Sequence, residues 1–103
     1  MKSEVKVYGF GSYFDSRTSY RDIDILIVHR TETDESCMKA LEIKRSILTD
    51  IKGAHVSILS ASAEKHFAFI FKSKAVLLGT VDENNFVKSV KTITSKVFEF
   101  RKI

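Results

Sequence analysis

The stretch GSYFDSRTSYRDIDILIV, residues 11–28, joins a turn-like start to a run of aliphatic residues that contains two aspartates. Residues two positions apart in a strand point to the same face, so Asp22 and Asp24 are expected to lie side by side. Two carboxylates at that spacing repel each other, and an apolar strand adds a desolvation cost. A compensating positive charge is therefore expected beside them.

Length and composition indicate one ordinary globular domain over residues 1–103. The chain is 44% hydrophobic and 29% charged, and its formal charge is +4, which is a folded composition with a basic tilt. No segment approaches the roughly 20 consecutive apolar residues of a membrane span, so we expect a soluble, cytoplasmic protein without a membrane partner. A single cysteine, Cys37, excludes an internal disulfide and a cysteine-based metal site.

Hydrophobic periodicity predicts alternating strands and helices. Valines alternate with other residues in EVKVYGF, where Val5 and Val7 share one face and Lys6 and Tyr8 the other. The same reasoning predicts strands over 4–10, 22–28, 54–60 and 75–80, and helices over 34–52, 60–74 and 83–103. Ser60 or Ser62 is the expected N-cap of the second helix, and its phenylalanines are expected to face inward.

The predicted C-terminal helix carries an apolar stripe. Its members are spaced 4, 3, 4 and 3 residues apart, a heptad-like pattern: Phe86, Val90, Ile93, Val97 and Phe100. The stripe either covers the sheet of its own domain or contacts another chain. We expect the second, with a protein partner or a second copy of this chain bound through the C-terminal segment.

Basic residues in the tail raise a nucleic acid as a further partner. They are Lys88, Lys91, Lys96, Arg101 and Lys102. No aromatic residues interleave with them to form a stacking platform, so a solvated helix face is the better interpretation, and nucleic-acid binding has weak support.

Four residues of the opening stretch carry a family resemblance. A strand followed by Gly11 and Ser12, then nine residues, then Asp22 and Asp24 between aliphatic residues, resembles the signature of the nucleotidyltransferase superfamily that includes DNA polymerase beta, and most closely its minimal nucleotidyltransferases. The resemblance implies an α+β, two-layer nucleotidyltransferase fold with a mixed sheet and helices packed on one face.

The resemblance also implies an activity. A minimal nucleotidyltransferase transfers NMP, here expected to be AMP, from a Mg²⁺- or Mn²⁺-bound ATP or other NTP to a hydroxyl of a partner protein or RNA, as the antitoxin-type members of toxin–antitoxin systems do. Asp22 and Asp24 are then the catalytic, metal-binding carboxylates, because Mg²⁺ prefers carboxylate oxygens together with phosphate and water.

The residues between the predicted strands 4–10 and 22–28 are the expected phosphate-binding residues. A glycine lets the backbone approach phosphates closely, and free N–H groups and the Ser12 hydroxyl donate to phosphate oxygens. Gly11 and Ser12 are thus the expected nucleotide-binding residues. Arg17 and Arg21 are candidates for further, bidentate phosphate contacts.

The chain departs from the family at one catalytic position. Active members carry a third carboxylate on the strand after the first helix, where this sequence offers Ser57 or His55. Ser57 is the better match, and His55 is the alternative, with a general-base role open to it. The family also has a helix before the first strand that these residues do not supply, so we expect a partner chain to cover that flank. A second interpretation follows: a catalytically degenerate member that acts as a nucleotide-binding or regulatory subunit.

Overall fold

A four-stranded mixed sheet forms the centre of the protein. The computed structural model describes residues 5–15 and 22–100. The strand order is β3-β2-β1-β4, in which β1 pairs antiparallel with β2 and β4, and β2 pairs parallel with β3. The bounds are β1 Val5–Phe10, β2 Ile23–His29, β3 Ala54–Ser60 and β4 Val76–Val81. An α+β fold is confirmed. No end of the four predicted strands differs from these bounds by more than one residue.

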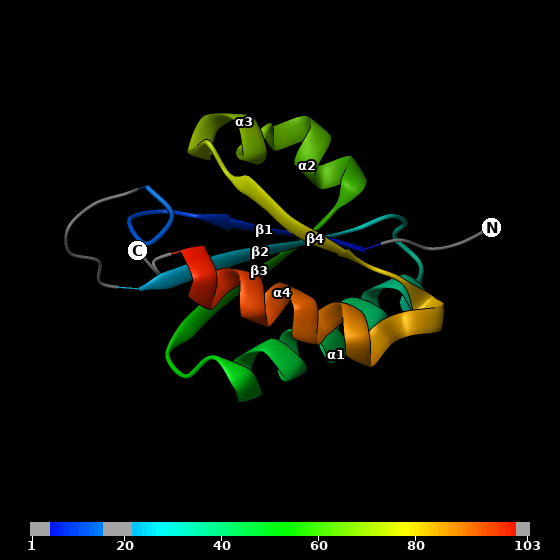
Figure 1. Cartoon of the computed structure of the whole chain (residues 1–103). Helices are drawn as coiled ribbons and strands as arrows, with labels where there is room; N and C mark the ends of the chain where they lie inside the picture. Colours follow the sequence, from blue (N-terminus) through cyan, green and yellow to red (C-terminus); the bar gives the residue numbers. More distant parts are fainter. Residues whose placement is uncertain (1–4, 16–21, 101–103) are drawn as a thin grey trace.

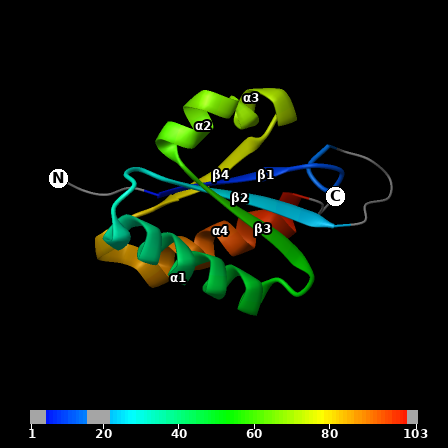
Figure 2. The same cartoon turned by 180° about the vertical axis from the view of Figure 1, so that it is seen from behind.

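Two long helices cover one face of the sheet. Helix α1 (Asp34–Asp50) and helix α4 (Phe86–Phe100), which follows the 3-10 turn η1 (Glu83–Asn85), lie together on the same side of the strands (Figures 1 and 2). The Thr33 hydroxyl caps α1 by accepting from the Ser36 N–H at 3.2 Å. Their inward side chains form the core with the odd-numbered residues of β1 and β2: Val5, Val7, Ile25, Ile27, Ile43, Ile47, Val90, Ile93 and Val97.

The opposite face carries two short helices, α2 (Ala61–Phe67) and α3 (Phe69–Ser73). Ser60 caps α2, as predicted, but Ala68 between the helices adopts a left-handed conformation with φ 53° that ends the first helix. Both helices lie across the sheet from α1 and α4 (Figure 1), and Phe69 packs edge-to-face on Phe10 of β1 at 4.9 Å. The expectation that all helices pack on one face is therefore corrected.

The break at Ala68 also changes where the phenylalanines point. Phe67 is 54% exposed and Phe71 is 85% exposed, so the prediction that the phenylalanines of this segment face inward is wrong for these two. Phe69, on Phe10, does face the sheet. The second face of the sheet is consequently only partly covered.

The apolar stripe of α4 belongs to the domain's own core. Val90, Ile93 and Val97 are 3%, 1% and 0% exposed and pack over β4 and against α1. These three members of the stripe are used inside the domain, whereas Phe100 at its end is 40% exposed. The stripe therefore covers its own sheet, and contact with another chain through this segment stays a prediction. Among the described residues, no helix combines the length and the apolar character that crossing a bilayer requires.

Candidate functional site

A tight turn at the end of β1 forms one wall of the site. Gly11 follows Phe10 with φ +80°, a conformation that glycine adopts without the cost of a Cβ. The Gly11 carbonyl accepts from the Phe14 N–H at 3.1 Å, and the Ser12 carbonyl accepts from the Asp15 N–H at 3.3 Å. In these two bonds Gly11 and Ser12 contribute their carbonyl groups, and the bonds close the turn directly after β1.

Two aromatic residues hold this turn in the core. Tyr13 is 4% exposed, and its hydroxyl donates to the carbonyl of Val97 in α4 at 2.8 Å. The ring of Phe14 lies directly on Gly9, where a Cβ would overlap it, and contacts the ring of Phe100 at 5.0 Å. The C-terminal helix thus fixes the position of Gly11 and Ser12, although it contributes nothing to the site itself.

Removing the Tyr13 hydroxyl tests this anchor. Tyr13→Phe leaves the Val97 carbonyl without its buried donor, and we expect the free energy of unfolding to fall by about 1–2 kcal/mol. Urea unfolding measures the change. Tyr8→Phe is the matched control, since Tyr8 is half-buried on the other face of the sheet; an equal loss in both variants would contradict the anchoring role.

The two aspartates lie at the start of β2 beside this turn. Asp24 pairs in register with Phe10 of β1 on one side and with His55 of β3 on the other. His55 Nε2 lies 3.5 Å from Asp22 Oδ1. One ligand atom from each of Asp22, Asp24 and His55 lies within 4.8 Å of the others, and we call these three residues the Asp–His cluster.

The electrostatics of the Asp–His cluster agree with the repulsion expected from the sequence. Burial raises the pKa of Asp24 above its ordinary value, and the negative charge of Asp22 raises this pKa further. His55 acts in the opposite direction and lowers it. The expected compensating group is therefore in part an imidazole, but it is 65% exposed and so is well screened by water.

The turn and the two aspartates of the Asp–His cluster line one cavity of about 480 Å³. Gly11, Ser12, Asp22 and Asp24 all line it, so the structure brings the four signature residues together. The proximity is close: a Cβ on Gly11 would overlap the Asp24 carboxylate. Arg17 and Arg21, the other two predicted nucleotide-binding residues, lie outside the described residues.

Three further polar residues line this cavity that sequence reasoning did not find: Asp15, Ser73 and Lys74. Lys74 ends α3 in a left-handed conformation with φ 57°. It reaches the site because β4 runs antiparallel to β1, with Val76 opposite Gly9, which brings the residues before β4 to the end of β1. Only the sheet order carries that information, and no local sequence signal does.

The register of β3 places the two candidates for the third-carboxylate position at different distances from the aspartates. His55 lies opposite Asp24, whereas Ser57 lies one same-face step further along, opposite Leu26. Of the two candidates, His55 is therefore the one whose side chain lies with the aspartates, and the role of either residue in place of a third carboxylate stays a prediction. The strand pattern AHVSILS fixed the face but not the one-pair difference in register.

No family model, curated protein or solved structure matches this chain. The features that bear on its function are its own: the glycine turn and the two aspartates share one cavity, and His55 lies beside these aspartates.

Proposed function

We propose that this protein is a minimal nucleotidyltransferase that binds an NTP with a divalent cation and transfers its NMP, with AMP the expected group, to a hydroxyl of a partner protein or RNA. The observation that carries the proposal is the convergence of Gly11 and Ser12 with Asp22 and Asp24 on one cavity. Segments separated in the sequence supply a phosphate-approach turn and a pair of carboxylates, and they lie so close that a Cβ on Gly11 would overlap the Asp24 carboxylate.

The donor set of the Asp–His cluster fits a divalent cation. Two carboxylates and an imidazole offer ligand atoms within 4.8 Å of one another, a spacing that one ion can bridge. Mg²⁺ is suited to the carboxylates together with phosphate and water, and Mn²⁺ also accepts imidazole. A bound dication would remove the Asp22–Asp24 repulsion and withdraw negative charge from the phosphate under attack.

The chain's own groups can hold the triphosphate beside these carboxylates. Gly11 presents backbone without a side chain, so phosphate oxygens can approach its N–H and the Ser12 hydroxyl. Lys74 also lines the cavity, and its cation can offset the phosphate charge that Asp15 and the two aspartates would otherwise repel. Positioning and charge balance are the main demands of phosphoryl chemistry.

His55 has a distinct role in this proposal. A ring nitrogen of His55 that does not hold the cation can accept the proton of the attacking hydroxyl, and the exposure of this side chain leaves room for a macromolecular acceptor. The same position favours the second candidate function, a nucleotide-binding or regulatory subunit without transfer, because the residue there is not a carboxylate.

A substitution at His55 distinguishes the two candidate positions on β3. His55→Asp adds a carboxylate beside Asp24, and we expect its affinity for Mg²⁺ to rise on the order of tenfold, since ligand charge tunes such sites. Calorimetric titration with Mg²⁺ measures this. Ser57→Asp makes the same kind of change opposite Leu26 and is expected to leave the affinity unchanged; the reverse result would contradict the register.

The proposed activity is tested by incubating the purified protein with each labelled NTP, Mg²⁺ or Mn²⁺, and a cell extract. Covalent label on a protein or RNA that requires Asp24 supports transfer, and the fraction labelled by each NTP gives the base preference. NTP binding without label on any macromolecule supports the regulatory alternative instead. If the protein shows no NTP binding and no label is transferred, both candidate functions are refuted.

A further inference from the structure

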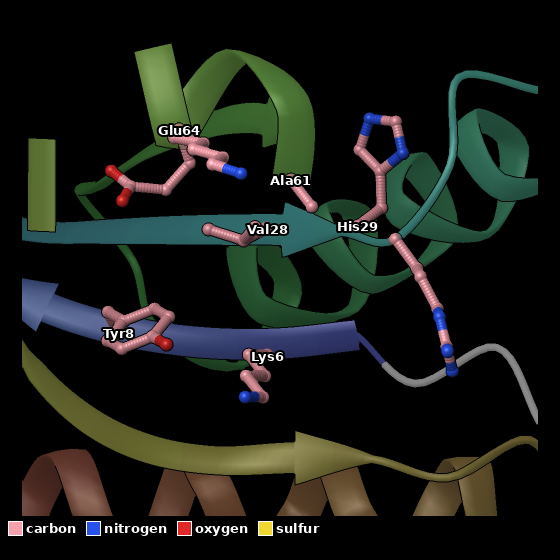
Figure 3. A pocket seen from close by; sticks show the side chains of 8 residues that line it. Lys6, Tyr8, Val28, His29, Ala61 and Glu64 are labelled. Carbon is pink, nitrogen blue, oxygen red and sulfur yellow. The ribbon is translucent and has the colours of Figure 1, made fainter. Parts of the chain in front are cut away.

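A second cavity, of about 470 Å³, lies at the other end of the α2–α3 face of the sheet. Tyr8 from β1 and Val28 from β2 form its floor, and α2 forms one wall with Ala61 and Glu64 (Figure 3). We call it the basic cleft, because Lys6, Arg30 and Lys65 also line it. Lys6 is four residues from Phe10 on β1, which places it about 13 Å along the strand from the Asp–His cluster.

Positive charge predominates in the basic cleft. Its three cationic side chains come from three different elements: β1, the residue after β2, and α2. Glu64 is the acidic residue of the lining, and its carboxylate already accepts from the Ile70 N–H at 2.8 Å, so it stabilises the start of α3. The cleft therefore presents a net positive rim to an incoming ligand.

An aromatic ring lies on the floor of the basic cleft. Successive side chains of β1 point to opposite faces of the sheet, so Lys6, Tyr8 and Phe10 all face away from the core formed with α1 and α4. Phe10 is covered by Phe69, but Tyr8 is only half-buried, and its neighbour on β4, Leu77, is 50% exposed. In Figure 3 the ring of Tyr8 and the side chain of Lys6 stand side by side on β1.

We propose that the basic cleft binds a segment of single-stranded nucleic acid, with a base stacked on Tyr8 and backbone phosphates on Lys6, Arg30 and Lys65. An aromatic floor with cations around it is the pattern that binds single strands independently of sequence. The three cations come from separate parts of the chain around the cleft, which suits a chain of phosphates better than a single phosphate. An acidic peptide would use the cations but would leave the Tyr8 ring without a stacking partner.

This inference goes beyond the proposed transferase, because it uses none of the residues of the Asp–His cluster. The two claims can therefore fail separately. Asp22→Asn with Asp24→Asn removes the proposed cation ligands and leaves the cleft intact. Without added metal, this variant is expected to bind oligonucleotide as well as the unchanged protein does.

The test is fluorescence anisotropy with a labelled single-stranded RNA of ten uridines, without metal or NTP. Three phosphate contacts predict a slope of about −2 for the logarithm of the binding constant against that of salt concentration, so affinity should fall roughly 20-fold from 50 to 200 mM salt. Lys6→Glu should weaken binding about tenfold or more, since it replaces a phosphate contact by a repulsion. Lys88→Glu, the same charge change on α4 across the sheet, is the matched control.

Substitutions at Tyr8 separate stacking from charge. Tyr8→Ala should weaken binding by about five- to 150-fold, whereas Tyr8→Phe, which keeps the ring, should bind normally. Thermal unfolding verifies that each variant is folded. The proposal is overturned if Lys6→Glu and Lys88→Glu have equal effects, if Tyr8→Ala binds normally, or if UMP or an acidic peptide competes as strongly as the unlabelled oligonucleotide.

Discussion

Replacing Gly11 by alanine is expected to abolish NTP binding while the protein stays folded. The new Cβ would overlap the Asp24 carboxylate and occupy the space through which phosphates approach the turn. The backbone at φ +80° adds strain of about 1–3 kcal/mol for a residue with a Cβ. Calorimetric titration with Mg²⁺ and a non-hydrolysable ATP analogue measures the loss of binding.

Gly53 provides a matched control for this substitution. It has nearly the same backbone conformation, with φ +82°, but a Cβ there would meet no atom within 4 Å. Gly53→Ala therefore carries the strain without the collision, and we expect it to lower stability by a similar amount and to bind the nucleotide normally. Normal binding by Gly11→Ala would mean that the phosphates do not lie against this turn.

The second large effect is expected from Asp22→Asn combined with Asp24→Asn. Cation-dependent NTP affinity should fall at least about 100-fold, because even the loss of an outer hydrogen-bond partner of a metal ligand costs 10–100-fold. Without metal, the double variant should melt a few degrees higher than the unchanged protein. Burial and the neighbouring charge both disfavour ionised Asp24, and asparagine removes that cost.

Both readouts are needed to interpret this variant. Glu42→Gln with Glu99→Gln removes two charges from exposed positions on α1 and α4, and controls for the change in net charge. A double Asn variant that binds the cation and NTP as the unchanged protein does would exclude the aspartates as ligands. A marked loss of its stability would show that they are structural residues.

Local patterns predicted the elements of the fold because each pattern has one physical cause. Alternation in β1 and β2 placed Val5 and Asp24 on their correct faces, and the Ser60 hydroxyl identified a helix start. The same rules could not show that Ala68 would break the following segment, because an alanine in the left-handed region contradicts its own helix propensity. They also could not decide what the stripe around Ile93 packs against, since periodicity reports a buried face and not its partner.

The site was predictable only as far as it is local. The spacing of Asp22 and Asp24 required adjacent carboxylates, and glycine followed by serine indicated a turn. The contributions of His55 and Lys74 depend on strand register and sheet order, which arise from packing of the whole domain. The basic cleft could not be predicted for the same reason: its cations come from β1, from the residue after β2 and from α2, and only the folded sheet brings them to one cavity.

The central claim is that one cation site lies between the glycine turn and the two aspartates. Paramagnetic broadening by Mn²⁺ tests it most directly, in ¹H–¹⁵N spectra recorded with a non-hydrolysable ATP analogue. The account predicts that trace Mn²⁺ broadens the amide signals of Gly11, Ser12 and Asp24, spares those of α1 and α4, and loses this effect in the Asp22→Asn, Asp24→Asn variant. Broadening that is centred elsewhere, or that persists in this variant, would contradict it.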